Sequence, residues 1–569
     1  MTSESIVFRL VCIACLVLAT STQAATYEVA QRNPGSNDSG DGSPARPWKT
    51  IGAAAGKVAP GDTVIIGEGI YREQVVVKIS GTEQAPIVFE AAPGAKVVLT
   101  GADVLAGWRK KEGALPIYHV PWSHRFIGWN KNMTHPEDEY HRLIGRCEQV
   151  VINGYMVRQV LDENQLAPGT FFSDLSNNLL DVWDAGSRDL NNAFVEASVR
   201  DEIFSVQGDF VQLRGLRFRL AANMAQHGAV VLGGSHDLVE DCSFEGMNSS
   251  GATFAGPNQV VRRCVFRDNG QLGFGANGAH DLLFTDCLVE NNNTKDFDRG
   301  WEAGGDKLVL CRHAVLERSR FLRNRGNGIW FDIGNEGCEV RQCLIADNED
   351  AGIFCEISFG LHAHDNVICG NGRAATGGAW GAQAGISLSS SPECWIERNL
   401  LVGNREGFNF REQTRSTPRI GKKGDEPIWN HDETISRNII ALNRDAQVWG
   451  WFDMKDGRQW PAKDKEQKGQ DKPDAINLEK LRLRFVDNVY FAEVGQGWFE
   501  WGVTWARHKS YRNLSDFQAD LGIDRGSRVL DPPFANMNGL DFRLVTSTMA
   551  TLKENYPQAP VPEVILGVP

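Results

Sequence analysis

Near the middle of the chain the sequence reads CLIADNEDAGIFCE, from Cys343 to Glu356. It combines a Cys, two apolar residues, an Asn five positions after the Cys, and a short apolar run that opens with Gly352. From about residue 205 onward this pattern recurs every 21 to 39 residues. A unit of this size cannot bury an apolar face by itself, so it must stack on its neighbours to form a solenoid.

The two fixed positions of the repeat carry small or amide side chains. The first position is occupied by Cys242, Cys264, Cys287, Ser319, Cys343, Asn366, Asn399 and Asn438. The second, five residues further on, is occupied by Asn269, Asn292, Asn324, Asn348, Asn371, Asn404 and Asn443, and only the first rung slips by one, to Asn248. Stacked Asn side chains can hydrogen-bond to one another and to turn backbone, and Cys fills such a slot as a small apolar residue. We therefore expect buried ladders, with thiols in preference to disulfides because Ser and Asn share the Cys position.

Each repeat holds short β-type runs and no helical stretch, which predicts an all-β fold, a right-handed parallel β-helix with an N-terminal cap and a β-rich insertion. A short capping helix is expected near Pro47-Trp-Lys-Thr-Ile-Gly-Ala-Ala, and another short helix at Leu514-Ser-Asp-Phe-Gln-Ala-Asp-Leu. The expected organisation is a signal peptide at 1–24, the cap and first rungs at 25–104, the insertion at 105–200, the main β-helix at 201–510 with surface loops at 413–432 and 453–478, and a C-terminal cap at 511–569.

The N-terminus has the pattern of an export signal. Arg9 precedes an apolar run from Leu10 to Ala19, and Thr22-Gln-Ala24 is a small-x-small cleavage site. The run is too short to span a bilayer, and no other stretch of the sequence reaches the required length. We expect a secreted or periplasmic protein without a membrane span. Its net charge of −13 also argues against nucleic acid as a partner.

The alternation of strand residues predicts which side chains face outward. In the run Gly328-Ile-Trp-Phe-Asp332, Ile329 and Phe331 should point inward and Trp330 and Asp332 outward. Aligned on the glycines, the neighbouring runs place Glu356, Ser389 and Arg411 in the column of Asp332. Phe354 and Lys307 fall beside Trp330, and Glu302 and Trp301 come shortly before Lys307.

This outward column supports three interpretations. Two carboxyl groups on adjacent rungs match the arrangement of retaining glycosidases, in which one is the nucleophile and the other the acid/base, and aromatic rings suit sugar faces. The same carboxylates could instead bind Ca²⁺, or form a solvated face neutralised by Lys307 and Arg411. No other metal site is expected, because no Cys-x-x-Cys or His cluster accompanies the cysteines. The histidines are scattered across rungs, and each is expected in a loop or a structural role: His227, His236, His313, His362 and His364.

Two segments resemble known families. Asp41-Gly-Ser-Pro through Gly69-Ile-Tyr-Arg-Glu resembles the entry segment of secreted parallel β-helix proteins of the pectate-lyase-like superfamily. The runs Gly328-Ile-Trp-Phe-Asp332 and Gly352-Ile-Phe-Cys-Glu356 are similar to β-xylosidases of glycoside hydrolase family 120. That resemblance implies Asp332 as nucleophile and Glu356 as acid/base, without a cofactor, although Ser358-Phe-Gly-Leu replaces the turn expected after the Glu.

Three function classes follow from these residues. The first is a retaining glycoside hydrolase acting on a plant or algal polysaccharide or oligosaccharide, with Lys307, Glu302, Trp301, Trp330, Phe354, Ser389 and Arg411 around the substrate. The second is a polysaccharide lyase with Lys307 as base and Ca²⁺ on the carboxylates. The third is a glycan-binding surface solenoid that cuts nothing.

Overall fold

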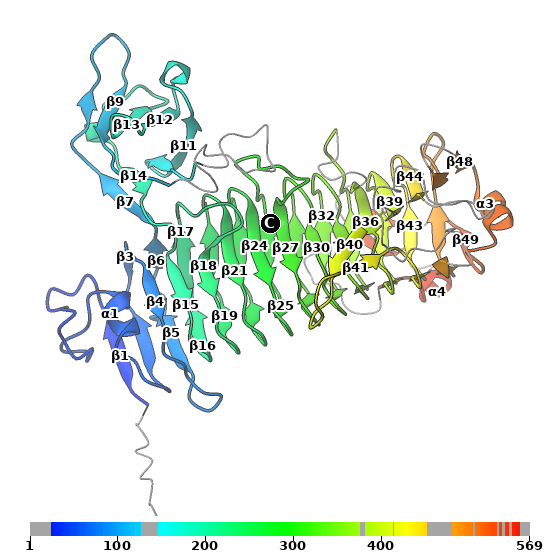
Figure 1. Cartoon of the computed structure of the whole chain (residues 1–569), viewed down its shortest axis with the longest axis horizontal. Helices are drawn as coiled ribbons and strands as arrows, with labels where there is room; N and C mark the ends of the chain where they lie inside the picture. The colour runs from blue at the N-terminus through cyan, green and yellow to red at the C-terminus, as the bar shows by residue number, and fades with distance from the viewer. Residues whose placement is uncertain are drawn as a thin grey trace, which may run out of the picture.

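The chain winds into a solenoid of three mainly parallel sheets, each with thirteen strands in the part of the chain that the structure describes (Figure 1). This computed structural model describes residues 24–126, 146–375, 382–412, 415–451, 481–503, 507–531, 534–536, 541–544 and 549–557. Sheet 1 runs from β1 (Thr26–Val29) to β45 (Arg484–Val486), and sheet 3 runs from β3 (Gly69–Tyr71) to β49 (Arg528–Val529). The protein is a right-handed parallel β-helix, as the repeat predicts.

Sheet 2 contains the candidate site. Its strands, in spatial order, are β4 (Val75–Val77), β15 (Phe204–Val206), β18 (Gly228–Leu232), β21 (Ser250–Phe254), β24 (Leu272–Asn277), β27 (Gly304–Val309), β30 (Ile329–Asp332), β33 (Ile353–Glu356), β36 (Ala384–Ser389), β39 (Glu406–Arg411), β44 (Ala446–Trp451), β47 (Phe499–Val503) and β48 (Arg507–Tyr511). Neighbouring strands pair in parallel, apart from the antiparallel pair β47–β48 that closes the sheet.

Stacked apolar side chains fill the interior of the solenoid. Phe218, Phe244 and Phe266 lie in one column, with ring centroids 5.2 Å and 4.5 Å apart. Such contacts recur because parallel strands in register bring equivalent residues of successive rungs together. Inward positions of all three sheets therefore form one continuous core.

The predicted ladders are present. The Asn348 amide donates to the Phe321 carbonyl at 3.0 Å and to Asn371 Oδ1 at 2.9 Å, and its own oxygen accepts from Asn324. Equivalent bonds join successive rungs from Asn269 to Asn443. The cysteines of the other ladder are free thiols in the interior. Both ladders satisfy buried turn backbone that would otherwise lack partners.

Gly352 shows why a glycine opens each run after the Asn ladder. A Cβ on Gly352 would lie 2.6 Å from the Gly385 carbonyl oxygen and 3.0 Å from the Asn371 amide nitrogen. Any side chain there would push the ladder away from the next rung. The repeat therefore keeps glycine for space, which lets the Asn amides approach the backbone.

Short helices lie at both ends of the core. Helix α1 (Ile51–Ala55) begins at Thr50, whose side chain accepts from the Ala53 N–H, and it buries Ile51 and Ala54. Helix α3 (Leu514–Leu521) begins at Asn513, and its Phe517 stacks on Phe499 at 4.3 Å. Each helix covers strand edges and apolar side chains that the terminal rung at its end of the solenoid would otherwise expose.

Between the first rungs and the main solenoid the chain forms a separate eight-stranded sheet, which stands to one side in Figure 1. It begins with β7 (Ala102–Leu105), contains β8 (Arg109–Lys110), β9 (Tyr118–Pro121), β10 (Val150–Ile152), β11 (Tyr155–Val160), β12 (Thr170–Asp174) and β13 (Leu179–Trp183), and ends with β14 (Val195–Ser198). This sheet has an apolar cluster of its own around Trp108 and Trp122.

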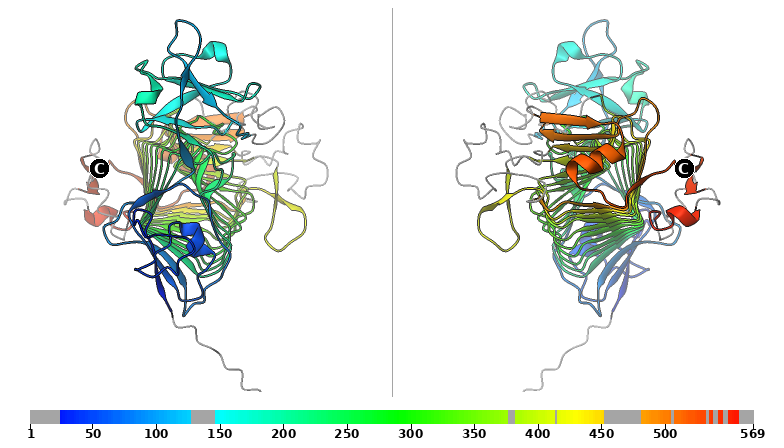
Figure 2. Two further views of the ribbon diagram at one scale, coloured as in Figure 1. Left: turned by 90° about the vertical axis from the view of Figure 1, so that its left-hand side faces the viewer. Right: turned by 90° about the vertical axis from the view of Figure 1, so that its right-hand side faces the viewer.

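The segment 413–432 differs from the expected surface loop. It holds the antiparallel hairpin of β40 (Arg415–Pro418) and β41 (Asp425–Ile428), which projects from the flank of the solenoid in Figure 2. Ile428 is buried against Ile357 and Phe359 and anchors the hairpin through apolar contacts. The high charge of the segment gave no indication of this contact. The loop expected at 453–478 and the signal peptide, apart from Ala24, lie outside the described residues. No helix among the described residues is long and apolar enough to cross a membrane.

Candidate active site

Backbone register brings the predicted outward residues into one column on sheet 2. Phe331 of β30 pairs with Leu308 of β27 and Cys355 of β33, which places Asp332 and Glu356 at equivalent positions. Glu356 pairs with Ser389, and Ser389 pairs with Arg411. Adjacent rungs are about 4.8 Å apart at the backbone, so the column is continuous.

The turn after each strand fixes the position of the column. Ile333 follows Asp332 with φ of 53°, and Ile357 follows Glu356 with φ of 39°. A left-handed backbone is unusual for a β-branched residue and costs about 1–3 kcal/mol. The chain therefore ends both strands sharply, at the two carboxylates. The same left-handed turn follows the neighbouring strands, at Leu310 and Ser390, so it belongs to the geometry of the rung.

Lys307 is the centre of the charge network. Its Nζ lies 2.9 Å from Asp332 Oδ2 and 3.8 Å from Glu302 Oε2, and it donates to the Trp301 carbonyl at 3.1 Å. Burial acts to lower the pKa of Lys307, but Asp332, Glu302 and Glu356 outweigh it and raise the pKa above the ordinary 10.5. Lys307 is therefore a fixed cation at neutral pH.

The two oxygens of Asp332 have different surroundings. Oδ2 is held by Lys307, whereas Oδ1 is buried and has no hydrogen-bond partner among the described residues. The carboxylate is thus oriented through one oxygen, while the other makes no hydrogen bond and is covered in the free protein, so a ligand must uncover it. An unpaired buried polar atom is costly, and it commonly marks a catalytic role or a missing ligand.

Glu356 pairs with a residue that the repeat did not reveal. Arg415, at the start of the β40–β41 hairpin, donates to Glu356 Oε1 at 2.7 Å. The pair joins residues 59 positions apart in the sequence. No periodic signal marks Arg415, because the insertion lies outside the rung pattern. Only its place in a charged segment near the site distinguishes it.

Glu302 lies beside Lys307, just before β27. Burial is the main cause that raises the pKa of Glu302, while Lys307 and a hydrogen bond from the Gln226 amide act to lower it. Gln226 is a second residue that the sequence did not single out. The site therefore holds one carboxyl group with a raised pKa near the two carboxylates of the column.

Ser389 and Arg411 complete the column in buried positions. The guanidinium of Arg411 lies 5.8 Å from the centre of the Phe354 ring. Burial lowers the pKa of Arg411 to about 10, opposed by Glu356 and helped by Arg415. It remains a cation at neutral pH, one rung beyond the Glu356–Ser389 pair.

The aromatic residues differ from the expected sugar platform. Trp330 and Phe354 do point away from the main core, but they are only 1% and 0% exposed and pack against Ala351 and Ala382. Lys307 Nζ lies 4.3 Å from the Trp330 ring centre. These rings therefore support Lys307 and Arg411 through cation–π contacts and offer no open face. Trp301 is half-buried beside Phe297.

A pocket of about 360 Å³ opens beside the charge network. Lys307 and Glu302 line one part of it, and Gln226, His227, Asn277 and Val309 line other parts. His227 is held at 2.9 Å by Glu202. The pocket lies on the rungs of sheet 2 that precede Asp332, and Lys307 lines the end nearest to that residue. A ligand in the pocket would therefore lie along the solenoid axis.

Comparisons with known proteins agree with this fold. Residues 227–401 match the model of the right handed beta helix region, and residues 47–107 match that of chondroitinase B. A stretch of 72 residues is 39% identical to the uncharacterized protein YwoF of Bacillus subtilis (strain 168), covering 13% of this chain and 15% of that protein.

Among solved structures, the complex of XylC with xylose superposes with a TM-score of 0.64 at 17% identity. It covers 90% of this chain and 87% of XylC. The alginate lyase AlyGC superposes with a TM-score of 0.44 at 11% identity, over 91% of this chain and 58% of AlyGC. Similarity to XylC at this level shows a shared right-handed parallel β-helix.

Proposed function

We propose that this protein is a retaining glycoside hydrolase acting on a plant or algal polysaccharide or oligosaccharide, with Asp332 as nucleophile and Glu356 as acid/base. The observation that carries the proposal is the division of roles within Asp332. Lys307 holds Oδ2 at 2.9 Å, and the buried Oδ1 has no partner among the described residues. A nucleophilic carboxylate needs one fixed oxygen and one oxygen free to attack.

The proposed reaction has two steps. Asp332 Oδ1 attacks the anomeric carbon while the Glu356 carboxyl protonates the leaving oxygen, which gives a glycosyl ester on Asp332. Glu356 then removes a proton from water, and that water displaces Asp332 with net retention. Arg415 holds Glu356 Oε1 at 2.7 Å in the free protein and so orients the carboxyl group.

The lyase alternative is less well supported by the charges of the site. A lyase with Lys307 as base needs a neutral amine, whereas the surrounding carboxylates raise the pKa of Lys307. Ca²⁺ assistance would require displacing Lys307 from Asp332 and Arg415 from Glu356, at 2.9 Å and 2.7 Å. A glycan-binding role without catalysis could use the same Asp332 oxygen as an acceptor for a sugar hydroxyl, so product formation is what separates the two roles.

Hydrolysis of a panel of aryl glycosides tests the proposal, beginning with the xyloside because XylC was solved with xylose. We expect Asp332→Asn to abolish turnover, and a 2-fluoro glycoside to leave a sugar ester on the peptide that contains Asp332. The matched control is Asp286→Asn, an exposed carboxylate paired with Arg318, which should keep full activity. Unsaturated uronate products from uronate glycans would favour the lyase. Glycan retention in affinity gels without any product would favour the binding role.

We also propose that the enzyme acts outside the cytoplasm, on the basis of the N-terminal apolar run and its cleavage site. N-terminal sequencing of the exported protein should find Ala25 as the first residue. A full-length chain retained in the cytoplasm would contradict this.

A further inference from the structure

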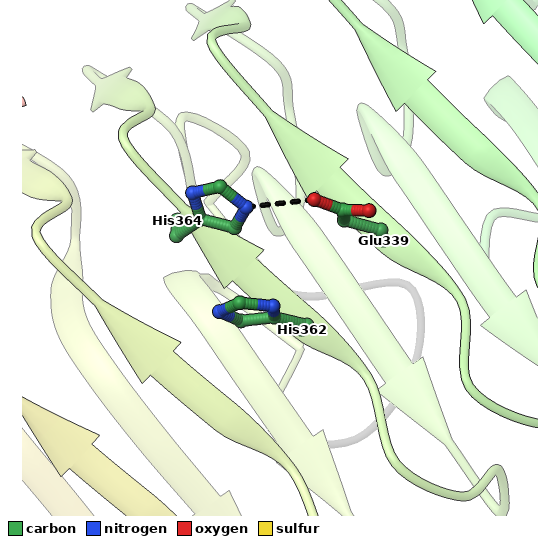
Figure 3. Close-up of side chains that lie close together, drawn as sticks. All are labelled: Glu339, His362 and His364. Carbon is green, nitrogen blue, oxygen red and sulfur yellow. Dashed lines mark hydrogen bonds and ion pairs between the residues drawn. The ribbon is translucent and has the colours of Figure 1, made fainter. Parts of the chain in front are cut away.

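A second polar cluster lies on sheet 1, away from the candidate active site. His362 and His364 are alternate residues of β34 (His362–His364), so both side chains point outward while Ala363 between them is buried. Glu339 of β31 (Glu339–Arg341) pairs with His362 on the neighbouring rung. Figure 3 shows the three side chains turned towards one another. Strand alternation thus places the two histidines, each expected in a loop or a structural role, on one face, and register adds Glu339.

The geometry of this cluster suits a metal ion. One ligand atom from each of Glu339, His362 and His364 lies within 4.8 Å of the others. Zinc binds imidazole nitrogen and carboxylate oxygen at about 2.0–2.2 Å, so an ion between these atoms needs only small side-chain movements. Two histidines and one glutamate form a common three-ligand zinc set, which leaves a position for water.

A further carboxylate orients the His364 imidazole, and another lies close to the His362 ring. Asp365 Oδ2 lies 2.7 Å from His364 Nδ1, which directs Nε2 to Glu339 Oε1 at 2.8 Å. Glu397 Oε1 lies 3.4 Å from His362 Nε2 without forming a hydrogen bond in this structure, and it can pair with Nε2–H when Nδ1 binds an ion. A carboxylate behind the second nitrogen fixes the tautomer and ring position of metal-binding histidines.

Packing also restricts the rings. The His362 and His364 ring centres are 4.2 Å apart, and Trp395 stacks on His362 at 4.8 Å with 14° between the ring planes. The side chains of the three candidate ligands are between 14% and 31% exposed, so an ion can reach them from solvent. The site is therefore ordered before binding and open on one side.

Arginines balance the charge of the cluster and provide a competitor for the ion. Arg341 lies 2.9 Å from Glu339 and 2.6 Å from Glu317, so it keeps a carboxylate partner when Glu339 turns to a metal. Arg398 pairs with Asp365 at 3.0 Å. The carboxylates behind the imidazoles thus stay anchored while Glu339 can be exchanged.

We propose that Glu339, His362 and His364 bind one divalent first-row transition metal ion, with zinc as the first choice. Imidazole with carboxylate favours this class of ion over Ca²⁺ or Mg²⁺, which prefer all-oxygen sites. The ion would join β31 to β34 across a rung boundary and hold a water at its open position. The proposal is independent of the glycosidase function, because it uses a different sheet and none of the residues of the candidate active site.

Isothermal titration of the tag-free full chain with zinc chloride tests the site, and cobalt substitution provides a visible spectrum of the ligand set. We expect one ion per chain, and at least about 100-fold weaker binding in Glu339→Gln and in His364→Asn, since each loses a direct ligand. His313→Asn is the matched control, an exposed histidine 3.5 Å from Asp281, and should bind zinc as the wild type does.

Arg341→Gln gives a test with the opposite sign, because it removes the cation that competes for Glu339. We expect it to tighten zinc binding by about tenfold, equivalent to the 1.4 kcal/mol of a modest charge interaction. Absence of stoichiometric binding by the wild type would overturn the proposal. So would unchanged affinity in the ligand variants, loss of binding in His313→Asn, or weaker binding in Arg341→Gln.

Discussion

Replacing Lys307 with Met tests the charge network of the candidate active site directly. The substitution keeps much of the side-chain length while removing the cation between Asp332 and Glu302. The Lys307 and Asp332 side chains are only 8% and 10% exposed, so solvent screens them poorly. At 2.9 Å and an effective dielectric constant of about 20, the pair attracts by about 6 kcal/mol before desolvation is counted.

The expected loss of unfolding free energy is about 3–5 kcal/mol, because Met leaves buried carboxylates without a cation. Urea titration followed by tryptophan fluorescence measures it. The difference should persist up to the ordinary lysine pKa of 10.5 and shrink above it, because a raised folded-state pKa stabilises the fold until the amine loses its proton. Turnover of an aryl glycoside should also fall by at least about 100-fold, as Asp332 loses the contact that orients it.

Lys509→Met is the matched control. Lys509 forms an ion pair with Asp520 at 3.0 Å, but the side chains are 51% and 40% exposed. Removing it should cost less than about 1 kcal/mol. If Lys307→Met were as stable as Lys509→Met, the reasoning from burial and proximity would be refuted. A Lys307→Met enzyme with normal turnover would refute the role given to Lys307 in orienting Asp332.

Three further predictions concern the ladder, a buried acid and the hairpin. Asn348→Ala should lower the free energy of unfolding by at least about 3 kcal/mol in thermal or urea unfolding, because it leaves buried backbone groups without partners. The control Asn33→Ala changes an exposed Asn and should alter that free energy by less than about 0.5 kcal/mol. Equal effects of the two substitutions would contradict the stabilising role of the ladder. Burial raises the pKa of Asp237 from 3.8 to about 8, so the folded protein holds a proton that the unfolded chain releases. The free energy of unfolding should therefore fall as the pH rises through that window, by up to about 1.4 kcal/mol per pH unit. Asp237→Asn should remove this slope, and an unchanged pH profile would argue against it. Arg415→Ala should lower the free energy of unfolding by about 1–2 kcal/mol, because Arg415 is 31% exposed but leaves Glu356, which is 9% exposed, without this cation. It should lower kcat/KM about tenfold, because Glu356 loses the contact that orients it. A large loss of stability with normal kinetics would show that Arg415 only anchors the hairpin.

Sequence pattern predicted the solenoid and the column because both depend on one-dimensional rules. Side chains alternate between the two faces of a strand, and equivalent residues of stacked rungs meet. Once Gly328 and Gly352 are aligned, Asp332 must fall beside Glu356, and the pairing of Phe331 with Cys355 confirms that register. The Asn ladder follows from the same rule.

What lay outside the repeat could not be derived in this way. Strand alternation predicts the outward direction of Trp330 and Phe354 correctly. It does not predict the residues that cover and bury these two rings. Arg415 and Glu356 are 59 residues apart in the sequence, and their contact depends on how the hairpin folds back onto sheet 2. Insertions have no rung register, so their contacts are set by side-chain packing and charge.

The same division holds for the histidine cluster. Spacing alone places His362 and His364 on one face of one strand. Glu339 joins them only because a parallel neighbour lies one rung away, and Asp365 then orients the His364 ring. The sequence by itself determined the rung, the inward and outward faces and the pair Asp332–Glu356, because strand geometry is local and periodic. The tertiary structure decided which side chains are covered and which charges meet across insertions, because those contacts depend on the path of the whole chain.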